Sequence, residues 1–586
     1  MPRKKPFSNK QKKQQLLQKR RNKGDSRKPL GVACSSSDSE HDNSEPEISV
    51  TKVHHQPSAE TSYDPNRYRL HFEKDSQQEL DLHKHEAKTK PLKTVAEEEM
   101  EISLDDIFKP GSILDIPKRP PWDYKMSKEK VESQESKMFE LYLKEIHGHY
   151  KPEDLSYFEH NLETWQQLWR VLEMSNIVLF ITDIRHPALH FSPSLFHHVK
   201  LDMNKDLVLV LNKVDLVPPP VAVAWRAYFQ TKFPDLHVIL FTSFPKEAST
   251  YQQVKVHTKM RRKGRRLLTA VGPEELLKVV EGIYKGKVDL SAWKSKLESG
   301  NVDTIDAVDS MGEESSDDDL HDNNSSVPAA QCSAILQSEN ACKAVVTIGM
   351  IGHPNVGKSS LINGLVGKKV VSTSRTPGHT KHFQTIYLTP TVCLCDCPGL
   401  VFPSLVNKRI QILSGIYPIA QVREPYTAVG YLAERVPLIK LLQLQHPNPP
   451  SITICSGEQE SMVWTAWDIC DAWANKKQYF TAKASRLDTY RAANSLLRLA
   501  LDGRISMFFV PPQFTKQREY WEAHPEVNKI KTLQDKGMIS EKEIVQSFSD
   551  STHSSGEEMP SEPPIHINRF DALLTLHDDV SLSDDS

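Results

Sequence analysis

Residues 345–366 read VVTIGMIGHPNVGKSSLINGLV, and the architecture that we expect for this chain starts from them. The apolar run at 345–351 predicts a buried strand, and the apolar positions of 358–366 predict a helix. Between them, residues 352–359 match the pattern GxxxxGK[ST], in which backbone N–H groups and a helix N-terminus converge on phosphate oxygens. The stretch therefore predicts a phosphate-binding loop between a strand and a helix.

The residues of this loop are predicted to surround the phosphates of a nucleotide. Glycines let the backbone approach a phosphate closely and adopt positive φ. Lys358 would neutralise the β- and γ-phosphates, and the Ser359 hydroxyl would bind Mg²⁺. The candidate contacts are Gly352, His353, Pro354, Asn355, Val356, Gly357, Lys358, Ser359 and Ser360.

A second motif, NKVD at residues 212–215, directly follows a predicted strand at 207–211. Taken alone it could be a polar turn, but next to a phosphate loop it favours guanine over adenine. Asp215 could accept from guanine N1 and N2, Asn212 would contact N7, and Lys213 would lie along the base. After a predicted strand at 238–241, a backbone amide would read guanine O6. The candidate base contacts are Asn212, Lys213, Val214, Asp215, Thr242 and Ser243.

Two later segments supply candidates for the metal and for the γ-phosphate. Asp396, at the end of a predicted strand at 392–396, would hold Mg²⁺ through water. In the segment 376–380, Thr380 is the expected switch threonine and Thr376 is the alternative. The candidate nucleotide contacts here are Asp396, Cys397, Pro398, Gly399 and Leu400. The candidate Mg²⁺ ligands are Ser359, Thr380 and Asp396, and the candidate catalytic residues are Lys358, Thr380 and Asn355.

The order of these motifs points to a permuted chain. In an ordinary GTPase the phosphate loop comes first, whereas here NKVD precedes Gly352 by about 140 residues. In this order NKVD, GHPNVGKSS, TPGHT and DCPGL resemble the circularly permuted GTPases related to nucleostemin and to the large-subunit export GTPase. The resemblance covers most of residues 1–530, including NRYRLHFEK at 66–74 and the basic N-terminal arm.

This resemblance implies an α/β P-loop GTPase fold, circularly permuted, with a mostly parallel sheet, helices on both faces, helical flanking regions and disordered charged tails. It implies binding of GTP and GDP with Mg²⁺, slow hydrolysis, a link to ribosome biogenesis, and residence in the nucleus or nucleolus with shuttling to the cytoplasm. Leu400 stands where many GTPases have the glutamine that orients the attacking water, so turnover would be slow or partner-activated. Asn355 resembles an asparagine that helps related GTPases bind K⁺, which makes K⁺ a candidate cofactor.

The hydrophobic pattern divides the 586 residues into five parts. We expect a disordered arm, basic then acidic, over 1–60; a partly helical extension over 61–160; the G domain over 161–420, with a disordered charged insertion at about 247–343; a mainly helical domain over 421–530; and an acidic disordered tail over 531–586. Further strands are predicted at 177–181, 383–388 and 452–455, and helices at 127–147, 161–174, 193–200 and 221–231.

The net charge of −2 averages over segregated blocks. Residues 1–30 hold twelve Lys and Arg against one acid, and residues 259–266 hold six basic residues. By contrast, residues 300–325 hold nine acids without Lys or Arg, and 541–586 hold eleven acids. The basic blocks fit rRNA or a pre-ribosomal particle, through counterion release, or a nuclear import receptor. A merely solubilising tail is the alternative.

Several other features bear on function class. Eight cysteines and a Lys-rich N-terminus without an apolar stretch indicate a reducing compartment, and no run approaches the length of a membrane span. We expect a monomer, phosphorylation of the Ser-acid cluster at 35–40, and structural rather than zinc-binding roles for Cys393, Cys395 and Cys397. The tryptophans Trp464, Trp467 and Trp473 fit a helical core, or alternatively a surface that stacks on nucleic-acid bases.

Two function classes remain open at this point. In the first, the protein is a GTPase that times an assembly step in the nucleus or nucleolus. In the second, it is a nucleotide-gated regulatory or scaffold protein with little physiological hydrolysis, which Leu400 favours. The intact Lys358, Ser359, Thr380 and Asp396 favour the first.

Overall fold

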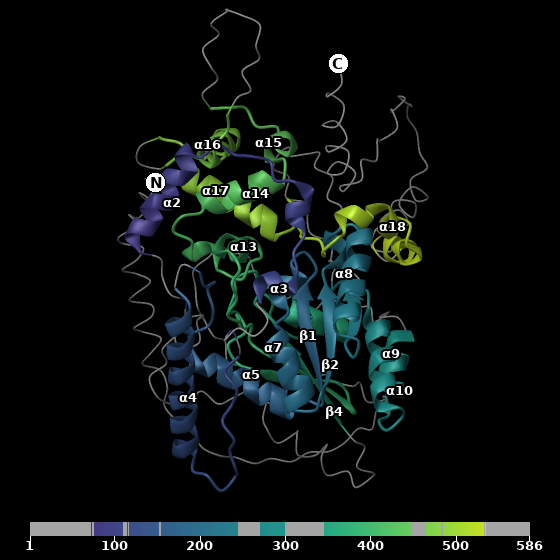
Figure 1. Ribbon diagram of the computed structural model, residues 1–586. Helices are drawn as coiled ribbons and strands as arrows, with labels where there is room; N and C mark the ends of the chain where they lie inside the picture. Colours follow the sequence, from purple (N-terminus) through teal and green to yellow (C-terminus); the bar gives the residue numbers. More distant parts are fainter. Residues whose placement is uncertain are drawn as a thin grey trace, which may run out of the picture. The chain divides into compact units, whose positions relative to one another are not determined.

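Among the described residues, six strands form one sheet in the order β3-β2-β1-β4-β6-β5. Figure 1 labels β1, β2 and β4 of this sheet. The computed structural model describes residues 72, 76–108, 114, 116–151, 154–243, 270–298, 345–447, 463–481, 485–532 and 534. The strands are β1 (Ile177–Asp183), β2 (Asp206–Asn212), β3 (His237–Phe241), β4 (Val346–Ile351), β5 (Gln384–Thr389) and β6 (Val392–Asp396). The β5–β6 pair is antiparallel and the other pairs are parallel. The mostly parallel sheet that the sequence predicts is confirmed.

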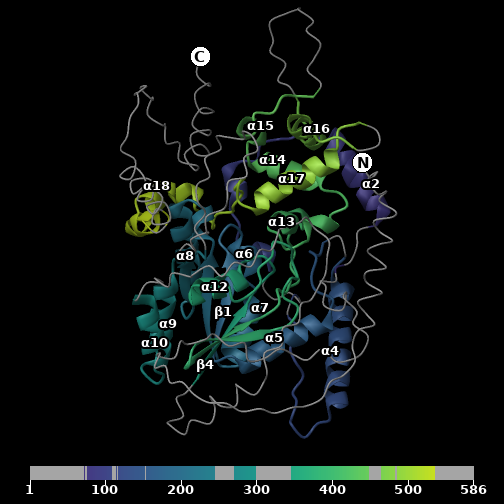
Figure 2. The same cartoon turned by 180° about the vertical axis from the view of Figure 1, so that it is seen from behind.

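Two apolar cores cover the two faces of the sheet, because successive strand residues point to opposite sides. In β1, Val178 and Phe180 face one core, whereas Leu179 and Ile181 face the other. The helices around the sheet are α5 (Leu162–Met174), α6 (Pro187–His190), α7 (Pro193–His197), α8 (Pro219–Lys232), α9 (Pro273–Tyr284), α10 (Ser291–Glu298) and α12 (Lys358–Val366). The first core holds residues of α5, α7 and α8, and the second holds residues of α9, α10 and α12. Figures 1 and 2 show the sheet from opposite sides, with α7 in front in the first and α12 in the second.

The predicted elements of this region agree with the structure within a few residues. The helix predicted at 358–366 is α12, which begins after Gly357 (φ 104°) and ends where Gly367 takes a φ of 81°. Left-handed φ values of this kind suit glycine, which has no Cβ to clash. The helix predicted at 193–200 is α7, continued by one π-helical turn at His198–Asp202.

The disordered insertion predicted over 247–343 is wrong for residues 270–298. These residues form α9 and α10, which bury Leu276, Val280 and the whole Trp293 side chain against the sheet. The apolar positions of α9 are three and four apart, so they share one helix face. This pattern is short and lies between the charge blocks at 259–266 and 300–325, so the charge blocks dominated the prediction. Residues 244–269 and 299–344, including the basic run 259–266, lie outside the described residues, as do 1–71 and the tail after 534.

The sheet has a topological switch point between β1 and β4. From β1 the chain continues to β2 and β3 on one side, and from β4 it reaches β6 and β5 on the other. Ligands of open α/β sheets bind at such a point, outside the carboxyl ends of the strands. Strands β1–β3, which carry the guanine motif, come first in the sequence, and strands β4–β6, which carry the phosphate loop, follow. Because β1 and β4 are neighbours in the sheet, the permuted motifs still meet at one site.

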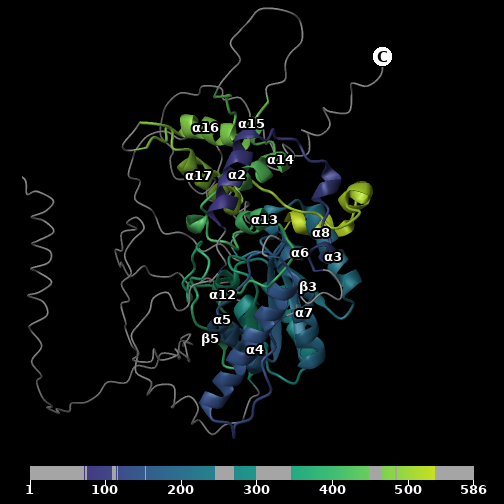
Figure 3. The same cartoon turned by 60° about the vertical axis from the view of Figure 1, so that its left-hand side comes forward.

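Most of the flanking helices contribute to the same apolar core that covers the α5, α7 and α8 face of the sheet. The flanking helices are α2 (Gln77–Thr89), α3 (Leu104–Ile107), α4 (Lys128–His149), α13 (Lys408–Leu413), α14 (Tyr426–Arg435), α15 (Leu438–Leu441), α16 (Ala466–Lys477), α17 (Thr489–Leu501) and α18 (Arg518–Glu522). Helix α14 packs against α2, α16 and α17, and Figure 3 shows these four helices together. None of the helices in the described ranges is long and apolar enough to cross a membrane.

The three tryptophans near α16 belong to this packing. Trp473 is buried, and Trp464 and Trp467 pack against the same core. The Lys88 Nζ lies 4.4 Å from the centre of the Trp467 ring. The structure therefore favours the core interpretation over stacking on nucleic-acid bases. The strand predicted at 452–455 falls outside the described residues.

Candidate functional site

The predicted motifs meet at one edge of the sheet, where the parallel strands end. Asp183 ends β1, Asn212 ends β2, Asp396 ends β6, and Gly352 follows β4. Because parallel strands present their carboxyl ends at the same edge, residues up to about 200 positions apart are brought together there.

The phosphate loop is held in an open curve by three left-handed residues. Gly352, Asn355 and Gly357 have φ values of 143°, 59° and 104°. The buried Lys358 Nζ donates to the carbonyl oxygens of Gly352 at 2.9 Å and His353 at 2.7 Å. Burial lowers the pKa of Lys358 to about 8, and Asp396 opposes this shift. The Lys358 ammonium group therefore lies inside the loop that is predicted to bind the phosphates.

The DCPGL segment closes over this loop. A Cβ added at Gly399 would lie 2.7 Å from Pro354 Cα, so only glycine allows this close approach. The backbone N–H of Leu400 donates to the Gly352 carbonyl at 3.2 Å. The Leu400 side chain is 1% exposed and belongs to the apolar core, so it lies among apolar side chains rather than in the phosphate cavity.

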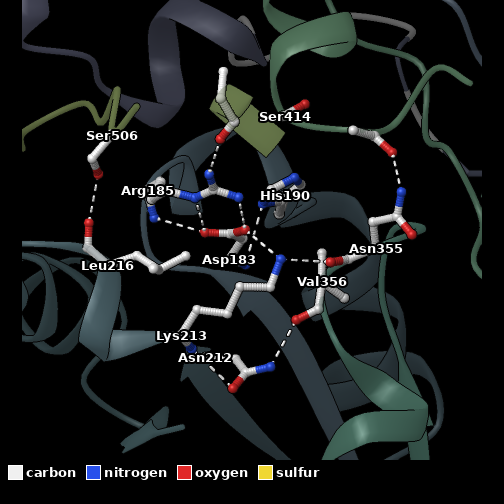
Figure 4. A network of polar contacts seen from close by, with 12 residues as sticks. Asp183, Arg185, His190, Asn212, Lys213, Leu216, Asn355, Val356, Ser414 and Ser506 are labelled. Carbon is white, nitrogen blue, oxygen red and sulfur yellow. Dashed lines mark hydrogen bonds and ion pairs between the residues drawn. The ribbon is translucent and has the colours of Figure 1, made fainter. Parts of the chain in front are cut away.

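The guanine motif is bonded directly to the phosphate loop, to residues 142 and 144 positions later in the chain (Figure 4). The Asn212 side chain donates to the Val356 carbonyl at 2.7 Å, and Lys213 Nζ donates to the Asn355 carbonyl at 2.7 Å. Asp215 is half-buried, and its Oδ1 accepts from the Thr242 hydroxyl at 2.7 Å. The Ser243 Oγ is buried without a hydrogen-bond partner among the described residues. Both strand ends predicted to read the base therefore lie together.

Three predicted Mg²⁺ ligands also come together. The Ser359 hydroxyl donates to Asp396 Oδ2 at 2.8 Å and lies 3.4 Å from Thr380 Oγ1. Asp396 is fully buried, burial raises its pKa, and its Oδ1 has no hydrogen-bond partner among the described residues. One buried carboxylate with an unsatisfied oxygen and two hydroxyls is the hard oxygen donor set that Mg²⁺ prefers. Thr380, rather than Thr376, contacts Ser359 here.

A cavity of about 70 Å³ lies beside these groups. It is lined by Pro354, Asn355, Gly357, Lys358, Ser359, Ser360, Ser372, Thr373, Ser374, Thr376, Gly378, His379, Thr380 and Gly399. Other predicted residues are buried and shape the site through their backbone: Val214, His353, Val356, Cys397 and Leu400. The His353 ring packs 5.2 Å from the His190 ring and 5.1 Å from the Phe402 ring.

Asp183 and Arg185 were missed by the sequence reasoning. Arg185 donates to both carboxylate oxygens of Asp183, at 3.0 and 2.8 Å, and Lys213 Nζ donates to Asp183 Oδ2 at 2.7 Å (Figure 4). Burial opposes ionisation of Asp183, but Arg185 and Lys213 hold its pKa well below the usual range. Arg185 also donates to the Ala500 carbonyl of α17 at 2.9 Å. The signal was an Asp-x-Arg sequence directly after a buried strand.

Asn355 connects the loop to two other segments. Its side-chain Nδ2 donates to the Arg375 carbonyl at 2.9 Å and to the Gly415 carbonyl at 2.8 Å. The Arg375 guanidinium pairs with the Asp502 carboxylate at 3.0 Å. The phosphate loop, the 372–380 segment and the region downstream of β6 are therefore bonded to one another.

The chain is similar in sequence to proteins described as GTPases or guanine nucleotide-binding proteins. Residues 347–427 match a family described as 50S ribosome-binding GTPase. The chain is 51% identical over 554 residues to guanine nucleotide-binding protein-like 1 of Homo sapiens, covering 91% of this chain and 90% of that protein. It is 31% identical over 419 residues to GTPase LSG1-1 of Arabidopsis thaliana, covering 70% of each. The GDP-bound structure of TM YlqF aligns with 59% of this chain and 99% of its own, at 16% identity and a TM-score of 0.31.

Fold and motifs define a GTP-binding protein with a circularly permuted P-loop GTPase domain. Within that class, the chain belongs to the family of guanine nucleotide-binding protein-like 1.

Proposed function

We propose that this protein is a GTP-operated switch of the nucleus and nucleolus that hydrolyses GTP slowly, or upon activation by a partner, during ribosome biogenesis. The observation that carries the switch is the Asn355 side chain. It bonds the backbone of Arg375, in the predicted switch segment, and of Gly415, downstream of the DCPGL motif. If a γ-phosphate and Mg²⁺ reposition Thr380, these bonds would transmit the movement to the helices downstream of the DCPGL motif.

Slow turnover is supported by Leu400. Its side chain is buried in the core and cannot hydrogen-bond an attacking water. The same observation favours the second candidate, a regulatory or scaffold protein for which GTP is a ligand that is rarely hydrolysed. Single-turnover hydrolysis by the full chain, with and without purified pre-ribosomal particles, separates the two. Acceleration by particles supports the assembly factor, and no acceleration supports the scaffold.

Binding to rRNA or a pre-ribosomal particle is supported by the basic blocks at 1–30 and 259–266. The first block would also be read by a nuclear import receptor, with phosphorylation of the nearby Ser-acid cluster as a control. Replacing the Lys and Arg of 1–30 by Gln should move the fluorescently tagged chain from the nucleus to the cytoplasm. Crosslinking of bound RNA in cells, with and without this replacement, tests the RNA contact.

Guanine specificity rests on Asp215. In an Asp215→Asn variant, GDP affinity should fall at least about tenfold, because the amide cannot accept both guanine N–H groups, and xanthosine diphosphate should bind better than GDP. Asp235→Asn, which changes an exposed carboxylate before β3, is the matched control. Equal GDP affinity in Asp215→Asn and wild type, measured by titration calorimetry, would contradict this assignment.

A role for K⁺ belongs to the same proposal, since Asn355 resembles the asparagine of K⁺-dependent relatives. Hydrolysis in K⁺ buffer should then exceed hydrolysis in Na⁺ buffer of equal ionic strength, and equal rates would remove K⁺ from the scheme.

A further inference from the structure

The turn that carries Asp215 has a buried carbonyl group without a donor nearby in the sequence. This turn is the 3₁₀ turn Val214–Leu216, which follows β2. In turns and helices a carbonyl pairs with the N–H group three or four residues later. For the Leu216 carbonyl these positions are Pro219 and Pro220, and proline has no N–H group. Because Leu216 is 4% exposed, its carbonyl needs a donor from another part of the chain.

Ser506 supplies this donor from 290 residues later in the chain (Figure 4). Its hydroxyl Oγ donates to the Leu216 carbonyl at 2.7 Å, and the serine is 7% exposed. Gly503 allows the two segments to approach. It has a φ of 67°, and a Cβ at this position would lie 2.9 Å from Leu216 Cδ2. Residues 503–506 therefore pack directly against the turn that follows the guanine motif.

Gln534 bonds the other side of the same turn. Its side-chain Nε2 donates to the Val214 carbonyl at 2.9 Å and to the Val217 carbonyl at 3.2 Å. Asp215 thus lies between one carbonyl that is held by Gln534 and another that is held by Ser506. The backbone of the base-reading residue is therefore oriented by the C-terminal part of the chain before a nucleotide binds, which reduces the cost of ordering it.

The segment that carries Ser506 is itself fixed to the G domain. The Phe509 N–H donates to the Arg185 carbonyl at 2.9 Å, and the Phe509 carbonyl accepts from Trp225 Nε1 at 3.0 Å. Phe509 is 3% exposed. These bonds fix the position from which the Ser506 hydroxyl reaches the turn, so the hydroxyl acts from a rigid support.

We propose that Ser506 is a positioning residue for guanine recognition. Through the Leu216 carbonyl, it holds the Asp215 carboxylate where that group accepts from guanine N1 and N2. Because Asp215 Oδ1 also accepts from the Thr242 hydroxyl at 2.7 Å, a small shift of the turn misdirects the carboxylate. The inference rests on the base-reading role proposed for Asp215, and it makes base specificity depend on a segment that follows α17.

The test is titration calorimetry of the full chain with GDP and with inosine diphosphate. Inosine has no 2-amino group, so it makes one bond to Asp215 where guanine makes two. In Ser506→Ala, GDP affinity should fall about tenfold and inosine diphosphate affinity about threefold, so the preference for GDP falls about threefold. Ser506→Thr keeps the hydroxyl and should retain the wild-type preference within about twofold.

The matched control is Ser495→Ala. It removes a hydroxyl on α17 that accepts from Trp473 Nε1, far along the chain from the guanine motif, and it should leave both affinities unchanged. Gln534→Ala, at a partly exposed position, should lower the preference for GDP in the same direction. It carries the test by the same criteria if Ser506→Ala does not fold.

The outcomes separate this inference from the assignment on which it rests. Equal loss of both affinities in Ser506→Ala, or no loss of either, overturns the positioning role. Asp215→Asn is titrated alongside. If that variant loses the preference for GDP while Ser506→Ala keeps it, only the positioning role is overturned. If Asp215→Asn keeps the preference, the base-reading assignment and the inference are both overturned.

Discussion

At the scale of single residues, Asp183 matters most for the site, although it is not among the residues predicted to contact the nucleotide or Mg²⁺. Asp183 pairs with two cations at once, the buried Arg185 and the half-buried Lys213, and Lys213 is the residue expected to lie along the guanine base. Asp183 and Arg185 are both 1% exposed, so neither charge can be left unpaired without a large desolvation cost. The base site is therefore supported by an ion cluster that also reaches α17 through Arg185.

Asp183→Asn should lower the free energy of unfolding by about 3 kcal/mol, because it leaves the buried Arg185 and the half-buried Lys213 without a counter-charge. GDP affinity should fall as well, since Lys213 loses its anchor. The double variant Asp183→Asn/Arg185→Met should be less destabilised than Asp183→Asn, because it removes one of the unpaired charges. Urea denaturation and GDP titration measure both effects.

The matched control is Lys144→Gln, which breaks an exposed ion pair with Glu140 on α4. Such solvent-exposed pairs contribute little to stability, because water screens both charges. If Asp183→Asn and Lys144→Gln lose similar amounts of unfolding free energy and of GDP affinity, the cluster around Asp183 does not support the site.

At the scale of elements, α9 and α10 show how a short amphipathic signal can be hidden by its surroundings. The second core of the sheet is completed by Leu276, Val280 and Trp293 from these helices. The Thr391 hydroxyl donates to the Asp289 carbonyl between them, which ties the pair to the β5–β6 hairpin. Residues 270–298, which were expected to belong to a disordered charged insertion, are thus packed on the sheet as part of the G domain.

Trp293→Ala should destabilise the protein by about 3–5 kcal/mol, the usual cost of removing a fully buried large aromatic side chain. Lys294→Ala, an exposed position on the same helix, should change stability by less than about 0.5 kcal/mol. Urea titration of the two variants in parallel is the measurement. If Trp293→Ala unfolds at the same urea concentration as Lys294→Ala, the packing of α10 on the sheet is not as described.

At the scale of the whole molecule, burial disfavours the charged form of His186, His190 and His353 near the nucleotide edge. Burial lowers the pKa of His186 and of His190 to about 3, from an ordinary value of 6.5. Between pH 6.5 and 3 the unfolded chain therefore binds protons that the folded chain does not. Their contribution to stability is complete above pH 6.5 and is lost progressively as the pH falls below it.

Acidification from pH 7.5 to 5.5 should therefore cost about 1 kcal/mol of unfolding free energy for each of these histidines. A His190→Asn variant keeps an acceptor for the Asp183 N–H but removes the titratable ring, so its stability should fall less over the same interval. Urea titrations at the two pH values measure the difference. An equal fall in variant and wild type would contradict neutral burial of His190.

Local sequence alone was sufficient for the six strands of the sheet, for α12, for the motifs at the strand ends and for their permuted order. Each depends on nearest-neighbour chemistry: short continuous apolar runs, glycine at positive φ and a Lys-Ser pair at a helix start. Only the tertiary structure could place Leu400 in the core, give Asn355 two partners and assemble Asp183, Arg185 and Lys213. The partners of Asn355 lie 20 and 60 positions away, and Lys213 lies 30 positions from Asp183. Such contacts are decided by packing and by the pairing of buried charge, which local patterns do not encode.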